Sequence, residues 1–154
     1  MQSICVFCSS SDSIDEVYFK TAIDLGCQIG DLKLDLVYGG GGIGLMGAVA
    51  RSVHKNGGRV VGVFPEFLRE KDEGFEYIEA DELIIAETMR IRKAIMDERA
   101  DAFIVLPGGI GTLEEAIEIM SMKQLGLTDK PLAFVNTNNF YDSLISNFQM
   151  MVGL

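Results

Sequence analysis

Five short, almost wholly apolar runs recur along the chain, separated by longer amphipathic stretches. Runs of this length that are rich in β-branched residues predict strands, and the stretches between them have the period of helices. Because each run is apolar almost throughout, both faces of each strand should be buried. We therefore predict an α/β fold: a Rossmann-like, doubly wound, mostly parallel sheet with helices on both faces. The predicted strands are residues 3–8, 35–39, 59–64, 101–106 and 131–136.

Local signals mark the helices between these strands. Residues 13–16, SIDE, match a capping box and predict a helix that continues to about Gly30. Further helices are expected at about 88–99 and at 113–125. The charged stretch 65–80 is predicted to be a loop with a short strand at 77–79.

The length and net charge of the chain argue against several classes of function. A chain of 154 residues suits one domain, which we place at 1–154. No apolar run approaches the roughly 20 residues that span a bilayer, and the N-terminus lacks the features of a secretory signal. We therefore expect a cytoplasmic protein with no membrane partner. The formal net charge of −10 argues against nucleic acid as a partner, since Lys and Arg contacts to phosphates dominate that binding.

The three cysteines and the single histidine do not indicate a metal site. An odd number of cysteines in an intracellular chain favours reduced thiols. Cys5 and Cys8 share one predicted strand, where residues three apart point to opposite faces, so we expect buried structural thiols. His54 lies in the helix predicted after a glycine-rich loop and should have a surface or packing role.

The first glycine-rich loop, residues 39–47, follows the second predicted strand and precedes a helix. Glycines allow a ligand to approach the main chain closely, and a helix N-terminus offers unpaired N–H donors to a phosphate. Gly42, Gly44 and Gly47 also match GxGxxG, with Glu66 as a ribose-binding candidate, which keeps a dinucleotide-dependent oxidoreductase open. A purely structural role in turn formation and helix packing is the alternative.

The second loop, residues 107–115, follows the fourth predicted strand, so both loops lie at the same edge of the sheet. Thr112 can add a hydroxyl donor to a phosphate cradle, and Glu115 lies at the start of the next helix. A carboxylate there can stabilise an oxocarbenium-like transition state and orient water. The alternative is that Thr112 and Glu115 form a capping box.

Taken together, these segments resemble the LOG family of cytokinin riboside 5′-monophosphate phosphoribohydrolases. The matching motifs are YGGGGIGLMG (38–47), RKAIM (92–96) and PGGIGTLEE (107–115), and the similarity covers nearly all of the chain. The resemblance implies hydrolysis of the N-glycosidic bond of AMP or an N6-modified relative to free base and ribose 5-phosphate. It also implies that neither a metal nor an organic cofactor is needed, and that the protein forms a homodimer or a larger homo-oligomer.

The resemblance assigns the site residue by residue. It implies that Arg92 and Glu115 form the catalytic pair. It implies substrate-binding roles for Ser9, Ser10, Gly40, Gly41, Gly44, Met89, Lys93, Gly108, Gly109, Gly111 and Thr112. The serine loop at 9–11 could instead cap the helix that follows it.

The chain departs from the family pattern at three positions and at its end. Arg90 and Ile91 replace the usual His and Glu before the catalytic arginine, and Met122 stands where a Trp is common. Recognition of a bulky N6 substituent is therefore open. Relatives typically continue beyond residue 154, so this sequence either lacks a C-terminal element or is a naturally short form. Apolar residues of 113–125, such as Ile117 and Ile119, belong either to the core or to a subunit interface.

Two further functions compete with the hydrolase. Proteins similar in fold and loops carry molybdenum cofactor, so a non-enzymatic nucleotide or cofactor carrier is the main alternative. The family has also been labelled lysine decarboxylase, which would require pyridoxal phosphate bound to a lysine. Lys93 is the only lysine near the predicted site, and no group that would hold a pyridine ring accompanies it.

Overall fold

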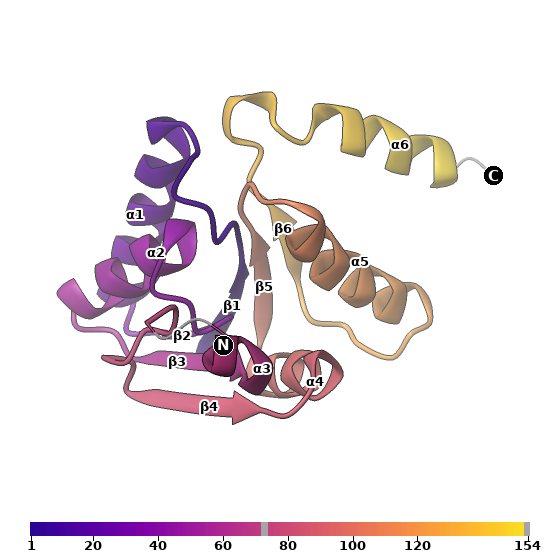
Figure 1. Cartoon of the computed structure of the whole chain (residues 1–154). Coiled ribbons are helices and arrows are strands. Elements are labelled where there is room, and N and C mark those ends of the chain that lie inside the picture. The colour runs from indigo at the N-terminus through magenta and orange to yellow at the C-terminus, as the bar shows by residue number, and fades with distance from the viewer. Residues whose placement is uncertain (72–73, 153–154) are drawn as a thin grey trace.

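The computed structural model describes residues 1–71 and 74–152, and its centre is a six-stranded parallel sheet. The strand order is β4-β3-β2-β1-β5-β6, and all five pairings are parallel. The predicted α/β, doubly wound class is confirmed (Figure 1). The strands are β1 (Ser3–Phe7), β2 (Asp35–Tyr38), β3 (Val60–Pro65), β4 (Glu82–Ala86), β5 (Ala102–Val105) and β6 (Leu132–Phe134).

Helices cover both faces of this sheet. The helices are α1 (Glu16–Asp31), α2 (Gly44–Lys55), α3 (Glu66–Lys71), α4 (Met89–Arg99), α5 (Ile110–Gln124) and α6 (Asp142–Val152), with a short 3₁₀ turn, η1 (Thr137–Asn139), before the last. In the part of the chain that the structure describes, no helix is both long and apolar enough to cross a membrane.

The strand β1 shows how two cores form on the two faces. Ile4 and Val6 pack with side chains of α1 and α2, whereas Phe7 packs with side chains of α4 and α5. Cys8 lies in the first core and Cys5 in the second, and both are buried free thiols, as predicted. Alternation along a strand therefore distributes one continuous apolar run between two layers of helices.

The strand order places the predicted loops beside each other. The chain leaves β1 toward β2 on one side and later returns to β5 on the other, and ligands bind at such a reversal, at the carboxyl ends of the strands. The loops after β1 and β5 contact each other there, because the N–H of Ser9 donates to the carbonyl of Pro107 at 3.2 Å. The point between these two strands is therefore where a ligand site is expected in this sheet.

Residues 65–80 differ most from the prediction. This stretch begins with the helix α3, and the expected strand at 77–79 is wrong, because the edge strand of the sheet is β4 farther along. Residues 75–77 instead pair locally with the first glycine-rich loop: Gly42 N–H donates to the carbonyl of Phe75 at 2.7 Å, and Tyr77 N–H to that of Gly40 at 2.8 Å. Residues 75–77 thus form a short antiparallel contact with this loop and do not join the sheet.

His54 anchors the segment that follows. One ring nitrogen lies 2.9 Å from the hydroxyl of Tyr77, and the other lies 2.8 Å from a carboxylate oxygen of Asp81. The packing role predicted for this histidine is confirmed, since it joins α2 to the chain leading into β4.

The first helix also begins differently from the prediction. α1 starts at Glu16, and its N-cap is Asp15, whose side chain caps no N–H group. The capping box expected at 13–16 is therefore wrong. The serines before the helix bond locally instead, because Ser11 Oγ accepts from Ser13 N–H at 3.1 Å. Such local side-chain bonds compete with helix formation.

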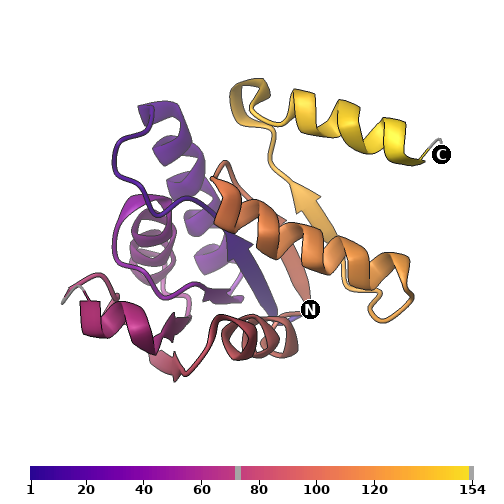
Figure 2. The ribbon, with the colours of Figure 1, turned by 45° about the vertical axis from the view of Figure 1, so that its right-hand side comes forward.

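The C-terminal helix packs only loosely on the rest of the described chain. None of its residues is buried, and Figure 2 shows α6 extending away from the sheet beside α5. The turn before it is held firmly, because the hydroxyl of the buried Tyr141 donates to the carbonyl of Leu106 at 2.7 Å. This bond ties the C-terminal segment to the end of β5.

Candidate active site

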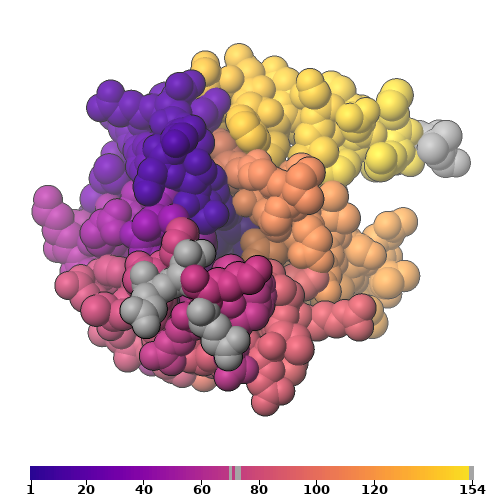
Figure 3. Space-filling model, in the orientation of Figure 1, coloured from indigo at the N-terminus to yellow at the C-terminus, as the bar shows by residue number. Residues whose placement is uncertain are grey.

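A cavity of about 560 Å³ opens at the carboxyl edge of the sheet, within the range of small-molecule sites. Figure 3 shows a recess on this side, between the indigo N-terminal segment and the orange surface of α5. The loops after β1, β2 and β5 form its polar wall. The predicted site residues that line it are Ser9, Ser10, Gly41, Met89, Arg92, Gly109, Gly111, Thr112 and Glu115.

Four predicted substrate-binding residues lie outside this lining. They are Gly40, Gly44, Gly108 and Lys93. Gly108 contacts Thr112 so closely that an added side chain would overlap with it. Lys93 lines a separate pocket of about 150 Å³ between α4 and α5, together with two of the positions that depart from the family pattern, Arg90 and Met122.

Arg92 lies in the first turns of α4 and is buried, with 6% of its surface exposed. Its Nε donates to the carbonyl of Val63 at 2.8 Å, and Nη1 donates to Glu115 Oε1 at 2.6 Å. Thr88 begins the helix by accepting the N–H of Ile91 at 3.2 Å, which fixes the turn that carries the arginine. The guanidinium is therefore held from two sides while it lines the cavity.

Glu115 reaches the same point from α5, where it lies in the second helical turn. Only 11% of its side chain is exposed. Burial raises the pKa of its carboxyl above the usual value, while the charge and hydrogen bond of Arg92 oppose this shift. A carboxylate whose pKa is raised, beside a cavity, has the properties of a general base.

The first glycine-rich loop has few donors left for a ligand. Gly44 N–H, at the start of α2, donates to Asp12 Oδ1 at 2.8 Å. The next N–H, of Leu45, donates to the carbonyl of Ser9 at 3.0 Å. The N-terminus of α2 is thus capped by the loop that follows β1, and the glycines here serve close packing.

The second loop is open by comparison. α5 begins at Ile110, its N-cap is Gly109, and no side chain caps it. The capping-box alternative for Thr112 and Glu115 is therefore wrong, because both residues lie inside the helix. Among the described residues, the N–H groups of Ile110, Gly111 and Thr112 have no acceptor. Unpaired donors at a helix N-terminus form a ready site for a phosphate.

The far wall of the cavity was missed by the sequence analysis. It is apolar and includes Phe64 of β3, Phe67 and Leu68 of α3, and Phe75. Phe67 and Phe75 are about 40% exposed, at 42% and 40%. The adjacent apolar residues Phe67 and Leu68, within the otherwise charged stretch after β3, were the sequence signal that could have predicted this wall. The cavity therefore joins a polar, phosphate-suited end to a wall suited to an aromatic ring.

Sequence comparisons connect this geometry to known proteins. A family model described as "Possible lysine decarboxylase" matches residues 46–153. The chain is 45% identical to cytokinin riboside 5′-monophosphate phosphoribohydrolase LOG2 of Arabidopsis thaliana, covering 93% of this chain and 66% of that protein. It is 46% identical to the probable enzyme LOG6 of the same plant, covering 94% and 71%. The chain thus spans about two thirds of the length of these relatives.

Solved structures share the fold at lower identity. The molybdenum cofactor carrier protein of Chlamydomonas reinhardtii gives a TM-score of 0.75 at 20% identity, over 96% of this chain and 85% of that chain. The molybdenum cofactor binding protein of Rippkaea orientalis gives 0.73 at 22% identity, with the same coverage. These similarities establish the fold alone. The family match and the relatives that are about 45% identical show that the chain belongs to the LOG family of cytokinin riboside 5′-monophosphate phosphoribohydrolases.

Proposed function

We propose that the protein hydrolyses the N-glycosidic bond of a nucleoside 5′-monophosphate, AMP or an N6-modified AMP, and releases free base and ribose 5-phosphate. The observation that carries this proposal is the Arg92–Glu115 pair, which lines the same cavity as the open N-terminus of α5. The relatives LOG2 and LOG6 bear the name of this activity.

The proposal gives a task to each part of the site. The N-terminus of α5 binds the 5′-phosphate, since its free N–H groups and helix dipole favour an anion. The ionised Glu115 carboxylate stabilises positive charge developing on the ribose and accepts a proton from the attacking water. The oxygen of this water bonds to C1′ as the bond from C1′ to the base breaks. The departing base takes up a proton from solvent, and Glu115 returns the proton of the attacking water to solvent. Arg92 keeps the carboxylate in place.

The remaining expectations from the sequence belong to this proposal. We expect a homodimer or larger homo-oligomer, a cytoplasmic location, and a reaction that uses neither a metal nor an organic cofactor. Apolar side chains exposed on α5, at its C-cap and on α6 support self-association; they include Ile117, Leu125, Met150 and Met151.

The test is the release of adenine from AMP by the purified protein, measured by chromatography, with adenosine and ATP as comparison substrates. Adenine should form from AMP alone, because the site is built around one terminal phosphate. Glu115→Gln and Arg92→Ala should each lower kcat by at least about 100-fold, as expected for groups that act on the transition state. Glu98→Gln, which neutralises an exposed carboxylate on α4, should retain the wild-type rate.

The alternative of a cofactor carrier makes a different prediction. A protein that folds, binds a pterin monophosphate tightly and leaves AMP intact would contradict the hydrolase and favour the carrier. Thermal unfolding of each variant shows whether a lost activity reflects a lost fold.

A further inference from the structure

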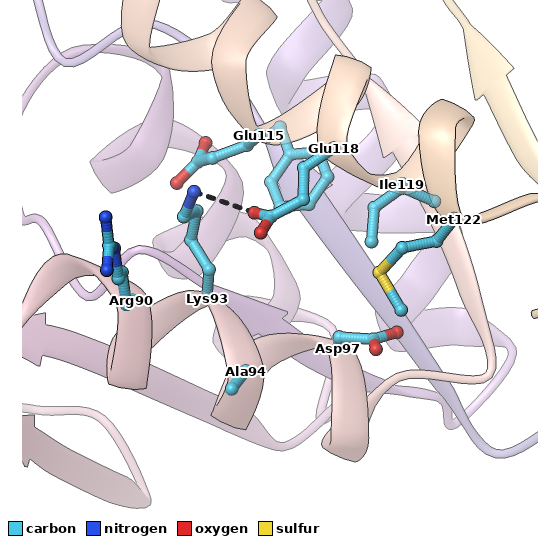
Figure 4. A pocket seen from close by; sticks show the side chains of 9 residues that line it. Arg90, Lys93, Ala94, Asp97, Glu115, Glu118, Ile119 and Met122 are labelled. Atoms are coloured by element: carbon cyan, nitrogen blue, oxygen red, sulfur yellow. Dashed lines mark ion pairs between the residues drawn. The ribbon is translucent and has the colours of Figure 1, made fainter. Parts of the chain in front are cut away.

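Lys93 lies next to Arg92 in the sequence but does not line the cavity that Arg92 lines. Its ammonium group forms an ion pair with Glu114 and a second with Glu118 Oε2 at 2.7 Å. Figure 4 shows Lys93 reaching from α4 toward Glu118 on α5, beside Glu115. The side chain is 14% exposed, so these contacts replace most of its hydration.

Two adjacent residues of α4 therefore bind α5 in two different ways. Arg92 pairs with Glu115. Lys93 pairs with Glu114 and Glu118, the two residues that flank Glu115 on the surface of α5. Burial lowers the pKa of the Lys93 ammonium, but its hydrogen bonds to both carboxylates outweigh this, and the pKa is raised overall. Lys93 is consequently a fixed positive charge between two helices.

The charges around Glu115 make its ionisation sensitive to Lys93. Burial raises the pKa of Glu115; the charge and hydrogen bond of Arg92 lower it, the negative charge of Glu114 raises it, and the positive charge of Lys93 makes a smaller contribution that lowers it. Burial raises the pKa of the nearby thiols Cys5 and Cys8, so both stay neutral. The titratable groups that face Glu115 are Arg90, Arg92, Lys93 and Asp97 of α4, Glu114 and Glu118 of α5, and these two thiols.

We propose that Lys93 is a positioning residue, which acts through Glu114 and Glu118 to hold α5 in place and to balance their charge, and which does not touch the nucleotide. This proposal rests on the hydrolase function, because it assigns Glu115 the role of an ionised carboxylate. It differs from the substrate-binding role that the family resemblance implies for Lys93.

The test compares Lys93→Met and Lys93→Arg with the wild type in adenine release from AMP between pH 4 and pH 8. Removing the positive charge leaves two carboxylates uncompensated beside Glu115, which raises its pKa. Activity requires the ionised form and is lost as the pH falls through this pKa. The acidic limb of the profile should therefore move to higher pH in Lys93→Met, with kcat about tenfold lower and KM within about twofold. Lys93→Arg keeps the positive charge, so its acidic limb should lie at the wild-type pH.

Glu118→Gln provides the opposite change, since it removes a negative charge near Glu115 and should move the limb to lower pH. A tenfold rise in KM for AMP with an unmoved limb in Lys93→Met would show a direct contact with the substrate and overturn the proposal. A limb that moves in the same direction in Lys93→Met and Glu118→Gln would also overturn it.

A titration that needs no turnover separates this proposal from the hydrolase itself. The carboxyl carbon of Glu115, followed by NMR in protein labelled at glutamate, should titrate at higher pH in Lys93→Met and at lower pH in Glu118→Gln. If the wild type releases no adenine, the hydrolase fails, whereas these shifts still decide whether Lys93 controls Glu115. An unmoved Glu115 signal in both variants overturns the positioning role.

Discussion

Gly39 makes room for the guanidinium of Arg92. An added side chain at Gly39 would overlap with Nη2 of Arg92 and lie 2.9 Å from the sulfur of Met46. This glycine directly follows β2 and lines the cavity. Its small size therefore serves the arginine, rather than the phosphate for which glycine-rich loops are usually examined.

Gly39→Ala should separate Arg92 from Glu115. The added methyl group displaces the guanidinium, so we expect kcat to fall by about 100-fold and the free energy of unfolding to drop by about 1–3 kcal/mol. Gly111→Ala is the matched control for stability, because no atom lies within 4 Å of its added side chain. Urea unfolding and adenine release measure both effects. A Gly39→Ala protein with the wild-type kcat would contradict this account.

The sequence predicted which residues line the cavity better than how they are held. The resemblance selected Arg92 and Glu115, which are 23 positions apart in the sequence. In the structure, Nη1 of Arg92 lies 2.6 Å from Oε1 of Glu115. Spacing alone could not show this pairing, because it depends on how α4 and α5 pack. An arginine on a helix is usually exposed to solvent. Arg92 is buried, and its Nε donates a hydrogen bond to the carbonyl of Val63 in β3, a contact that the sequence does not reveal.

The N-termini of α2 and α5 show that similar loops can differ in their free donors. Both helices follow a strand and a glycine-rich turn, yet α2 is capped through Asp12 and Ser9 whereas α5 begins without a side-chain cap. The sequence predicted both loops as phosphate sites, because composition does not show where N–H groups donate. The contact from Asp12 to Gly44 spans 32 positions and follows from the strand order.

Asp12→Ala should therefore change stability without changing catalysis. Losing the acceptor for Gly44 N–H should lower the free energy of unfolding by about 1 kcal/mol, the usual effect of removing a helix cap. The KM for AMP should stay within about twofold of the wild type. Chemical unfolding and steady-state kinetics give the two values. A large rise in KM would instead indicate that the first glycine-rich loop binds the nucleotide.

Elements at the edge of the sheet were the hardest to predict. β4 is half-buried along most of its length and begins with Glu82, which pairs with Arg59 and Arg99, so its pattern is weaker than that of the central strands. The four central strands, β3, β2, β1 and β5, are apolar because both faces are covered, and all four were predicted. The other edge strand, β6, was also predicted, from the run at 131–136. α3 was missed because a short charged helix lacks the periodicity of a longer one.

Across the whole molecule, the order of the strands determines the position of the cavity. β1 at the centre has β2 on one side and β5 on the other, which places residues from the first and the last third of the chain around one opening. Outside this opening, α5 and α6 expose apolar side chains, including Ile117 at 46% and Met151 at 63%. Ile119 is buried in the core, whereas Ile117 is exposed, so the core role predicted for this helix holds for one of its faces.

Self-association should be visible as mass in solution. Light scattering coupled to gel filtration should give at least twice the 16.9 kDa of one chain, because the exposed apolar surface on α5 favours burial against a second copy. Ile117→Glu places a charge on this surface and should shift the mass toward one chain. A wild-type mass of one chain at micromolar concentration would contradict the predicted homo-oligomer.

The occupied donors of the first loop bear on how a glycine motif is interpreted. Gly42, Gly44 and Gly47 match a dinucleotide signature, yet the N–H groups of Gly42, Gly44 and Leu45 already donate to Phe75, Asp12 and Ser9. In this chain the motif thus connects two loops and a segment before β4. An acidic residue at the position of Asp12 is therefore a feature to examine before such a motif is interpreted as a ligand site.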